Sequence, residues 1–386
     1  MHKAFLSLKI ICFYVEFIYR PINIVTSYIE VYCMSFYIIK EENGMIIVLK
    51  RNAEERDILS FVSQIKGSHD IEVEKIKGSD CTVLGLIGDT SSLSTEQFET
   101  EYIVHKVMRV REPFKKANRA FHPEDTILNI KNRKIGGGDI TIIAGPCSVE
   151  SEDQIVSIAG EVKAAGASFL RGGAYKPRTS PYAFQGLEED GLELLKIARE
   201  KTGLPIVTEI MYPQTIEKFV EDVDIIQVGA RNMQNFALLK ELGKTNKPIL
   251  LKRGLSSTIE EWIMAAEYIM AGGNKEVILC ERGIRTFESY TRNTLDLSAI
   301  PAIKKLSHLP IIVDPSHATG LAYMVDTMCM AAIAAGADGV IVEVHNNPAK
   351  ALCDGPQSIT PKDFGKLVNK LEKYAAIADR KISRGN

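Results

Sequence analysis

Three basic side chains lie in a short segment that follows an apolar run and contains two glycines and a proline. They are Arg171, Lys176 and Arg178, in the sequence LRGGAYKPRTS at residues 170–180. Glycine and proline exclude a helix interior here, so turns must hold these cations, and cations held by turns can converge on one anion. A solvated basic loop is the simpler interpretation of one such segment. An anion-binding site is favoured because further cations end other apolar runs, at Arg231, Lys252 and Arg282.

A second group of side chains has the chemistry of a metal site. It combines a thiol, an imidazole and two carboxylates, from Cys147, His317, Glu343 and Asp354. Such a mixed sulfur, nitrogen and oxygen set suits a divalent transition ion. No short ligand motif joins these residues, and each alone has a common structural interpretation: a buried thiol, a loop histidine, a salt-bridged carboxylate. The metal hypothesis gains weight because the first three all lie at or just after the ends of apolar runs.

The elements that must position both groups can be derived from the rhythm of the chain. Eight short β-branched runs alternate with helical segments between residues 139 and 380. This alternation predicts a (β/α)8 TIM barrel of typical size. The active site of such a barrel lies at the carboxyl ends of its strands, which is where the cations and the candidate metal ligands gather. We therefore expect one barrel mouth that binds several phosphate or carboxylate groups beside a metal ion.

Residues 45–112 precede the barrel and show the order strand, helix, strand, strand, helix, strand. This order predicts a small α+β ferredoxin-like domain. It carries no convergent catalytic set, so it is either a structural appendage or a ligand-sensing regulatory module. Residues 113–138 are expected to form a linker and a hairpin.

Residues 1–44 differ in character from the rest of the chain, because they are crowded with aromatic residues and isoleucine and lack clear caps. Lys9 and Glu16 interrupt the apolar stretch, which is shorter than the ~20 residues of a membrane span and has no cleavage site after it. Met45 opens a clean alternating strand. We expect a leader that is disordered or not native, with a natural start at Met45.

Composition excludes several classes of function. The 386 residues include 47 basic and 49 acidic residues, a net charge of -2, so no overall field attracts nucleic acid or an anionic membrane. The seven cysteines form no CxxC pair and are odd in number, which argues against a disulfide framework. The chain is expected in a reducing cytoplasm.

Long motifs, in a fixed order, connect these observations to a known family. The motifs include IIAGPCSVE, LRGGAYKPRTSPYAFQGL, IIQVGARNMQNF, PILLKRG, ILCERGIRTFE, RNTLDLSAI, IIVDPSHATG, VIVEVH and CDGPQS. Residues 45–386 resemble 3-deoxy-D-arabino-heptulosonate-7-phosphate (DAHP) synthase, in its type I β subgroup with an N-terminal ferredoxin-like regulatory domain. The resemblance implies a transferase that condenses phosphoenolpyruvate with erythrose 4-phosphate and water and releases phosphate. That reaction opens the shikimate pathway to chorismate and the aromatic amino acids.

The resemblance also implies residue roles. Phosphoenolpyruvate would be held by Arg171, Lys176, Ala230, Arg231, Lys252 and Arg282. Erythrose 4-phosphate would be held by Lys176, Pro177, Arg178, Thr179 and Asp354. One divalent ion, Mn, Fe, Co or Zn, would be bound by Cys147, His317, Glu343 and Asp354. Lys176 is the candidate for proton handling near the aldehyde, and Cys147 and His317 complete the predicted catalytic set.

Two alternatives stay open at this point. 3-Deoxy-manno-octulosonate-8-phosphate synthase shares the barrel and phosphoenolpyruvate but takes arabinose 5-phosphate, and it has a KANRS-like sequence where this chain has Pro177 between Lys176 and Arg178. A catalytically decayed sensor protein is the other alternative. For the N-terminal domain, the resemblance implies feedback inhibition by an aromatic amino acid, tyrosine or phenylalanine, bound between ferredoxin-like domains of a homotetramer.

Overall fold

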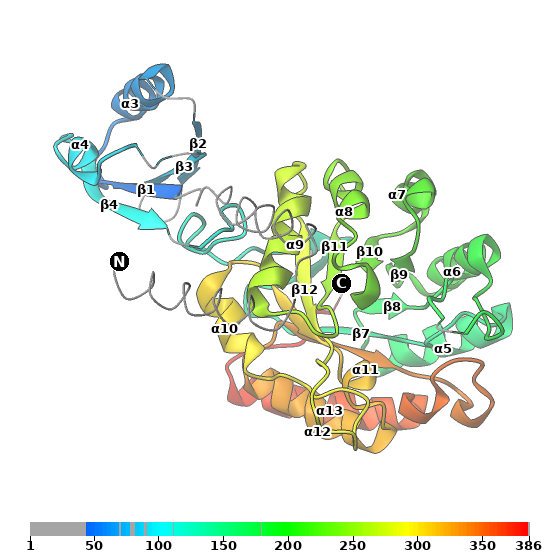
Figure 1. Ribbon diagram of the computed structural model, residues 1–386. Coiled ribbons are helices and arrows are strands. Elements are labelled where there is room, and N and C mark those ends of the chain that lie inside the picture. The colour runs from blue at the N-terminus through cyan, green and yellow to red at the C-terminus, as the bar shows by residue number, and fades with distance from the viewer. Residues whose placement is uncertain are drawn as a thin grey trace, which may run out of the picture.

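The computed structural model describes residues 44–68, 71–77, 82–88, 90, 92–110, 112–178 and 180–384 (Figure 1). The predicted leader lies outside these residues except for Gly44, and Thr179 of the basic segment lies outside them as well. Among the helices of the described ranges, none has the length and apolar character needed to span a membrane.

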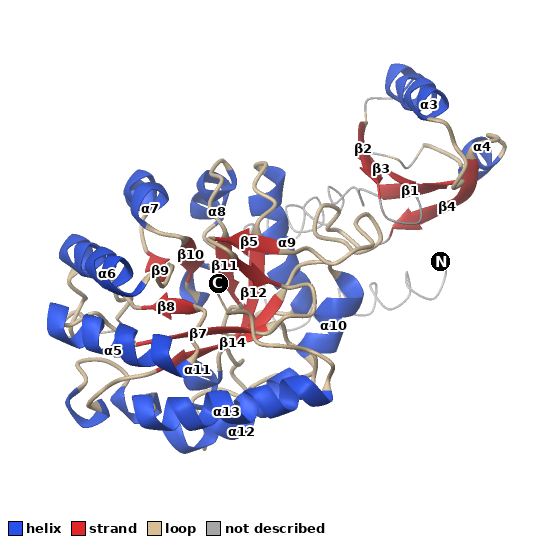
Figure 2. Cartoon of the chain, turned by 180° about the vertical axis from the view of Figure 1, so that it is seen from behind, coloured by secondary structure: helices blue, strands red, loops and turns tan. Residues whose placement is uncertain are grey.

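The N-terminal part folds as a four-stranded antiparallel sheet with two helices. Its elements are β1 (Gly44–Leu49), α3 (Glu55–Ser68), β2 (Glu72–Lys77), β3 (Thr82–Ile87), α4 (Thr95–Glu99) and β4 (Val104–Val110). The strand order is β2-β3-β1-β4, which confirms the predicted ferredoxin-like arrangement. Both helices cover one face of this sheet (Figure 2). Met45, Ile47 and Leu49 alternate along β1 and are buried in the core on the helix-covered face.

The other face of this small sheet contacts the segment that leads to the barrel. Phe121 of that segment is 1% exposed and packs with Ile46 and Val83 of the sheet. A side chain at Gly85 of β3 would collide with the Phe121 ring, because an added Cβ would lie 2.4 Å from it. The absence of a side chain at Gly85 therefore makes room for Phe121.

The remainder of the chain is a closed barrel of eight parallel strands, as predicted. The strands are β7 (Thr141–Gly145), β8 (Phe169–Arg171), β9 (Ile206–Ile210), β10 (Ile225–Val228), β11 (Ile249–Lys252), β12 (Val277–Glu281), β13 (Ile311–Val313) and β14 (Gly339–Glu343). The last strand, β14, pairs with the first, β7, and this pairing closes the barrel.

Helices surround the barrel strands (Figures 1 and 2). They are α5 (Glu152–Ala165), α6 (Glu188–Thr202), α7 (Ile216–Asp222), α8 (Phe236–Gly243), α9 (Ile259–Ala271), α10 (Ala299–Leu306), α11 (Pro315–Thr319), α12 (Ala322–Ala334) and α13 (Pro361–Ile377). Local sequence fixes several of their ends. Thr258 and Glu261 form a capping box at the start of α9, and Gly166 adopts the left-handed conformation that ends α5.

The predicted hairpin closes the amino-terminal end of the barrel. It consists of β5 (Leu128–Ile130) and β6 (Arg133–Ile135), joined by Lys131 and Asn132 with φ of 45° and 63°. Three hairpin residues pack with at least one apolar side chain from each of the eight barrel strands, including Phe169 of β8. Asparagine tolerates this left-handed turn, and two such residues match the twist of a hairpin. Because the hairpin fills the amino-terminal end of the barrel, the carboxyl ends of the strands are the side that remains for a ligand.

The predicted linker between the two parts packs against the barrel. Phe114 and Ala117 are buried in the barrel core. The Glu267 carboxylate of α9 accepts hydrogen bonds from the backbone N–H groups of Lys116 and Ala117, both at 2.8 Å. Residues 113–127 therefore form an anchor segment that is fixed to the barrel rather than a free tether.

Candidate active site

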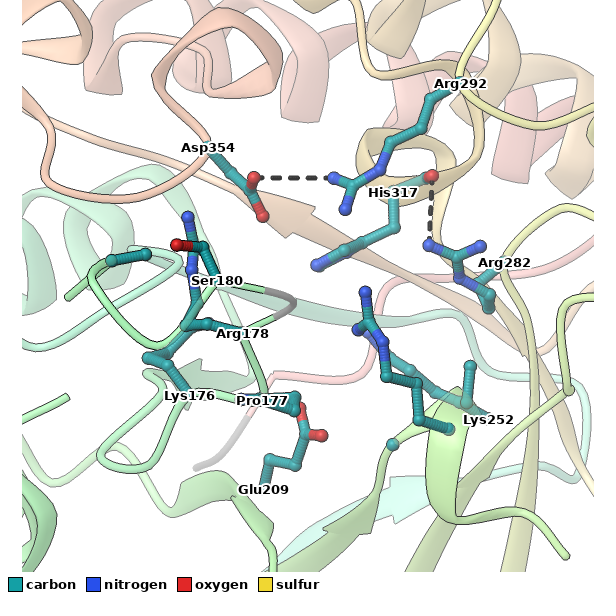
Figure 3. Close-up of a pocket in the computed structure, with 14 residues that line it drawn as sticks. Lys176, Pro177, Arg178, Ser180, Glu209, Lys252, Arg282, Arg292, His317 and Asp354 are labelled. Carbon is teal, nitrogen blue, oxygen red and sulfur yellow. Dashed lines mark hydrogen bonds and ion pairs between the residues drawn. The ribbon is translucent and has the colours of Figure 1, made fainter. Parts of the chain in front are cut away.

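A pocket opens among the loops that extend from the carboxyl ends of the barrel strands (Figure 3). Its volume is about 300 Å³. Its lining consists of Lys176, Pro177, Arg178, Ser180, Ala183, Glu209, Gly229, Ala230, Arg231, Lys252, Arg282, Arg292, His317 and Asp354. Six of these residues are cationic and two are acidic, so the pocket favours ligands with several negative charges.

The basic segment after β8 enters this pocket, as the sequence predicts. The backbone of Gly173 pairs with Ser148 at the end of the β7 loop, and its N–H donates to the Cys147 carbonyl at 3.0 Å. A side chain at Gly173 would collide with that carbonyl. The close approach brings Lys176 Nζ within 3.0 Å of both the carbonyl oxygen and the Sγ of Cys147. The anion-binding loop and the candidate metal group are therefore in direct contact.

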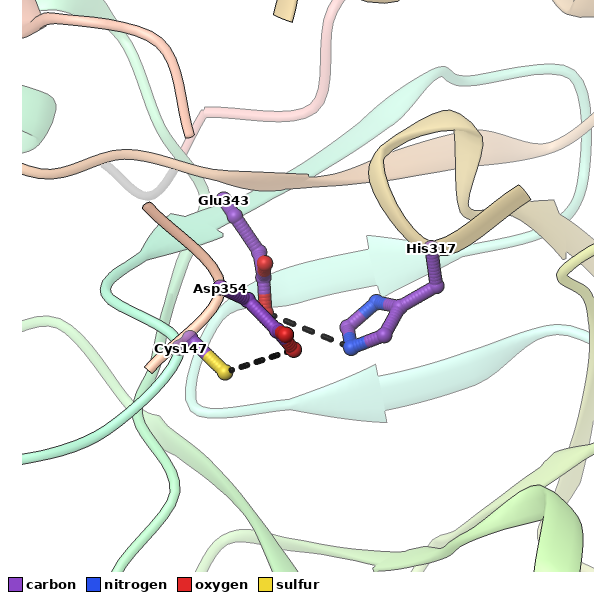
Figure 4. Close-up of side chains that lie close together, drawn as sticks. All are labelled: Cys147, His317, Glu343 and Asp354. Atoms are coloured by element: carbon purple, nitrogen blue, oxygen red, sulfur yellow. Dashed lines mark hydrogen bonds and ion pairs between the residues drawn. The ribbon is translucent and has the colours of Figure 1, made fainter. Parts of the chain in front are cut away.

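The four predicted metal ligands converge (Figure 4). One possible ligand atom from each of Cys147, His317, Glu343 and Asp354 lies within 4.8 Å of the other three. Cys147 Sγ lies 3.3 Å from Asp354 Oδ2, and His317 Nε2 lies 3.3 Å from Glu343 Oε1. Ligand atoms at about 2.0–2.3 Å from a shared ion have comparable separations. The donor set and its spacing therefore fit one divalent transition ion.

Neighbouring groups orient these four side chains. His317 Nδ1 lies 2.7 Å from Asp314 Oδ2, so the neutral imidazole carries its proton on Nδ1 and presents the Nε2 lone pair to the cluster. Asp354 adopts left-handed backbone angles, with φ of 51°. Aspartate tolerates this conformation better than most residues, and strained backbone of this kind occurs at functional sites.

Buried contacts also fix the Glu343 carboxylate. Arg171 Nη1 donates to Oε1 at 2.5 Å and Gln357 Nε2 donates to Oε2 at 2.6 Å. Burial alone would raise the pKa of Glu343, but electrostatic interactions with His317 and with the Arg171 guanidinium outweigh it and hold that pKa below its usual value. Burial likewise opposes ionisation of Asp354, yet His317 and Arg292 lower the pKa of Asp354 to about 2. Both carboxylates are therefore anionic at neutral pH.

The deepest cations of the site have unused hydrogen-bonding capacity. Lys252 Nζ donates to Asp314 Oδ2 at 2.6 Å, and Arg282 Nη2 donates to the His317 carbonyl at 3.3 Å. Among the described residues, Arg282 Nη1 and Arg171 Nε are buried and have no hydrogen-bond partner. An unsatisfied buried charged donor costs at least about 1–3 kcal/mol. The Arg282 guanidinium lines the pocket, so an anionic ligand there would supply the missing acceptor.

The structure brings most of the sequence-predicted residues into one site. Nine of them line the pocket, namely Lys176, Pro177, Arg178, Ala230, Arg231, Lys252, Arg282, His317 and Asp354. Cys147, Arg171 and Glu343 are not among the pocket-lining residues and lie nearly fully buried beside it, with exposed fractions of 1%, 3% and 1%. Thr179 lies outside the described residues.

Cys353 is a buried cysteine, a residue type that usually has a packing role. In the structure it lies in contact with two residues of the site. Its Sγ accepts from the Cys147 thiol at 3.3 Å and from Arg178 Nη1 at 2.5 Å. The hydrogen bond from Cys147 is the main cause that lowers the pKa of Cys353 to about 7. Cys280 and Cys329, by contrast, are buried in apolar cores and serve as packing residues.

Two further residues of the site are missing from the sequence predictions. Arg292 lines the pocket, and its Nη1 donates to Gln357 Oε1 at 3.0 Å and to Asp354 Oδ1 at 3.4 Å. Gln357 is 3% exposed and also donates to Glu343. The only sequence signal for either residue is its place in a recognised motif, RNTLDLSAI for Arg292 and CDGPQS for Gln357.

Comparisons with known proteins agree with this geometry. The family model described as DAHP synthetase I family matches residues 122–379, and the one described as DAHP synthase ferredoxin-like domain matches residues 45–112. The phospho-2-dehydro-3-deoxyheptonate aldolase of Thermotoga maritima is 50% identical over 339 residues, which cover 88% of this chain and 100% of the relative. The crystal structure of that Thermotoga maritima enzyme, also named DAHP synthase, matches with a TM-score of 0.70, covering 88% of this chain and 99% of the other.

More distant relatives carry the name of the alternative enzyme. The 2-dehydro-3-deoxyphosphooctonate aldolase of Geobacter sulfurreducens is 30% identical, covering 65% of this chain and 98% of the relative. Its match is weaker than that of the heptonate enzyme in both identity and share of this chain. The matches to the catalytic family and to the ferredoxin-like domain, together with 50% identity to a DAHP synthase over almost the whole chain, show that this chain belongs to the DAHP synthetase I family.

Proposed function

We propose that the chain condenses phosphoenolpyruvate with erythrose 4-phosphate and water to give 3-deoxy-D-arabino-heptulosonate 7-phosphate and phosphate. The observation that carries the proposal is one pocket in which six cations lie beside a cluster of four metal-type ligands. The two substrates bring two phosphates and a carboxylate, and their mutual repulsion must be neutralised before carbon atoms can meet. The pocket offers that neutralisation.

Phosphoenolpyruvate is assigned to the side of the pocket formed by the ends of β10, β11 and β12. Lys252 and Arg282 are buried there, Ala230 and the exposed Arg231 line the same side, and Lys176 lines the side next to Cys147. The unpartnered Nη1 of Arg282 supports this assignment, because a phosphate or carboxylate oxygen would accept from it. Arg171 is assigned to phosphoenolpyruvate as well. Its Nη1 holds Glu343, while its buried Nε has no hydrogen-bond partner among the described residues and is left for an anionic ligand.

Erythrose 4-phosphate is assigned to the side formed by the basic segment. Lys176, Pro177 and Arg178 line that side, and Thr179 is the next residue in the sequence. Asp354 lines the pocket opposite, where its carboxylate can accept from a sugar hydroxyl. The aldehyde carbon would then lie between the phosphoenolpyruvate group and the metal ligands.

Cys147, His317, Glu343 and Asp354 would hold one divalent ion, Mn, Fe, Co or Zn. Such an ion supplies Lewis acid chemistry, polarising the aldehyde oxygen or a water molecule. Lys176 Nζ, in contact with Cys147, is the group that would give a proton to the oxygen of the aldehyde as the carbon–carbon bond forms. The proton stays on the new hydroxyl group of the product.

Two assays test the proposal against its rivals. Purified protein loaded with Mn²⁺ is supplied with phosphoenolpyruvate and either erythrose 4-phosphate or arabinose 5-phosphate, and phosphate release is measured. We expect turnover with the four-carbon sugar, because Pro177 stands in the aldose loop; a preference for the pentose would favour the octulosonate enzyme. EDTA should abolish turnover and added Mn²⁺ should restore it. A protein inactive with both sugars under every metal tested would be the decayed sensor.

Regulation and assembly form a second part of the proposal. The ferredoxin-like domain supports an effector role, and we assign it feedback inhibition by tyrosine or phenylalanine within a homotetramer. A cytoplasmic location is proposed from the odd number and spacing of the cysteines, and the four described cysteines are free thiols.

A further inference from the structure

The loop between β12 and α10 brings one more arginine to the pocket than the predicted substrate residues include. This is Arg292, the first residue of the motif RNTLD at positions 292–296. The other polar residues of the motif serve the fold. Asn293 Nδ2 donates to the His317 carbonyl at 3.1 Å, and the Asp296 carboxylate accepts from Arg253 Nη1 at 2.8 Å. Arg292 alone of the motif lines the pocket.

The backbone and the stem of Arg292 are held in place. Its N–H donates to the Thr319 carbonyl at 2.9 Å. Gly320, with φ of 73°, ends the short helix that carries His317. A Cβ added at Gly320 would lie 2.8 Å from the Cβ of Arg292, so the bare glycine backbone makes room for the arginine stem. The position of Arg292 is thereby tied to the element that presents His317.

The guanidinium of Arg292 is oriented by residues that also serve the metal cluster. Gln357 uses its Nε2 donor on Glu343, so its Oε1 is presented to Arg292 Nη1 at 3.0 Å. The same Nη1 lies 3.4 Å from Asp354 Oδ1, on the side of Asp354 that Figure 3 shows facing Arg292. One nitrogen therefore makes both contacts. Among the described residues, Nε and Nη2 of Arg292 have no partner, and the side chain is 39% exposed.

Without Arg292, the pocket would offer fewer cations to the phosphate of the sugar than to the two anionic groups of phosphoenolpyruvate. Arg231, Lys252 and Arg282 are available for the two anionic groups of phosphoenolpyruvate, whereas Arg178 stands opposite them and shares its Nη1 with Cys353. Arg178 and Arg292 lie on different sides of Asp354, each held by the loop at residues 353–357 (Figure 3). A sugar phosphate bound beside Asp354 would have one arginine on each side of it.

We propose that Arg292 is a further substrate-binding residue and contacts the phosphate of erythrose 4-phosphate. This inference rests on the proposed function. Its free Nε and Nη2 provide the planar donor pair that binds phosphate oxygens, and the fixed stem and Gln357 hold that pair in place before the substrate arrives. The contact lies apart from the bond-forming atoms, so Arg292 acts on the binding of one substrate.

The test compares Arg292→Gln and Arg292→Lys with the wild type, with Arg285→Gln as the matched control. Arg285 lies on the same loop and is exposed, but it does not line the pocket. Steady-state kinetics give KM for each substrate, and erythrose is used beside erythrose 4-phosphate as an aldose without the phosphate. Competition with a chromophoric chelator gives the Mn²⁺ affinity of each protein.

For Arg292→Gln we expect kcat/KM for erythrose 4-phosphate to fall about 10- to 100-fold, the worth of a hydrogen bond to a charged group. The rate with erythrose, the KM for phosphoenolpyruvate and the Mn²⁺ affinity should each change by less than about threefold. Arg292→Lys should recover part of the loss, and Arg285→Gln should match the wild type.

Equal losses with erythrose and erythrose 4-phosphate would overturn the inference, because Arg292 would then act through Asp354 and the metal site. A tenfold loss of Mn²⁺ affinity in Arg292→Gln would do the same. The proposed function has a separate test in the wild type: if that protein does not consume phosphoenolpyruvate with erythrose 4-phosphate, the function and this inference both fail. If the wild type is active and the variant keeps its KM for the sugar phosphate, this inference alone fails.

Discussion

Two cysteines contact each other at the active site, and only one of them belongs to the candidate metal cluster. Cys147 belongs to the cluster of four possible ligands, whereas Cys353 contacts Cys147 and Arg178 from outside it. We predict that Cys147→Ala retains no stoichiometric Mn²⁺ after desalting, because one of four ligands is lost. Cys353→Ala should still bind the ion, with affinity lowered by at most about 10- to 100-fold, as for partners that only orient a ligand.

Elemental analysis of both variants, reconstituted in parallel, is the measurement for the cysteine pair. Circular dichroism serves as the control that each variant is folded. Stoichiometric metal in Cys147→Ala would remove this residue from the ligand set, and loss of metal from Cys353→Ala alone would exchange the two assignments.

Lys176 contacts both the metal group and the pocket, so its charge can be tested separately from its bulk. Lys176→Met keeps most of the side-chain volume and removes the ammonium. We expect kcat to fall about 10²- to 10⁴-fold, the usual contribution of a positioned proton donor. Mn²⁺ binding should persist, because Lys176 supplies no ligand atom. Single-turnover assays would measure the chemical step, and full turnover in the variant would exclude the proton-donor role.

At the scale of elements, a buried histidine adds to the contacts that hold the anchor segment on the barrel. His308, just before β13, lies 2.8 Å from the Lys116 carbonyl through Nε2 and 2.6 Å from Thr126 Oγ1 through Nδ1. The Lys116 carbonyl can only accept, so neutral His308 carries its proton on Nε2. Burial is the main cause that lowers the pKa of His308 to about 4, from an ordinary value of 6.5.

This lowered pKa makes stability depend on pH. Above pH 6.5 His308 is neutral in the folded and unfolded states, so it does not change the free energy of unfolding. Between pH 6.5 and 4 the histidine of the unfolded state binds a proton that the folded state does not bind. Stability is therefore lost as the pH falls through this window, by about 2 kcal/mol at pH 5 relative to pH 7.5. Urea unfolding at both pH values should show this component in the wild type and lack it in His308→Gln. His105→Gln, an exposed position on β4, is the control and should behave as the wild type. Identical pH dependence in wild type and His308→Gln would contradict the prediction.

Helices, strands and turns can be predicted from the sequence where a local pattern of residues determines them. The eight β-branched runs correspond to the eight barrel strands, and the polar pair Lys131 and Asn132 forms the left-handed hairpin turn. The capping box of Thr258 and Glu261 marks where α9 begins. Burial pattern, caps and turn residues act locally, so the sequence alone indicates them.

What the sequence could not predict depends on how distant segments approach. Arg292 and Gln357 are 65 residues apart and meet only because their loops leave neighbouring parts of the barrel rim. Cys353 has the residue type of a packing position, and only the folded chain shows its contact with Cys147. Phe121 resembles part of a linker, because nothing in its own segment indicates the bare Gly85 that accommodates it.

At the scale of the whole molecule, the small domain and the barrel have separate apolar cores, joined by the anchor segment. We predict that a chain of residues 113–386 keeps kcat/KM for erythrose 4-phosphate within about threefold and loses inhibition by tyrosine or phenylalanine, because the effector domain is gone while Phe114 keeps its place in the barrel core. Inhibition that persists in this chain would place the effector site on the barrel.

The truncation point itself can be checked with a second chain, residues 122–386. This chain lacks Phe114, Ala117 and the two hydrogen bonds to Glu267. Loss of a buried phenylalanine typically costs about 3–5 kcal/mol. Thermal unfolding should therefore show a lower Tm for residues 122–386 than for residues 113–386, and equal values would mean that the anchor segment adds nothing to the barrel.

The pairing of β14 with β7 closes the barrel, and it fixes when the four candidate ligands of a nascent chain can first meet. Cys147 leaves the ribosome 207 residues before Asp354, and His317 and Glu343 also emerge late. At about 5–20 residues per second, synthesis of that interval takes on the order of 10–40 s. For most of this time the emerging chain holds only one of the four candidate ligands, Cys147. The four side chains therefore come together only after almost the whole barrel has been synthesised, and their meeting requires that its first and last strands have paired.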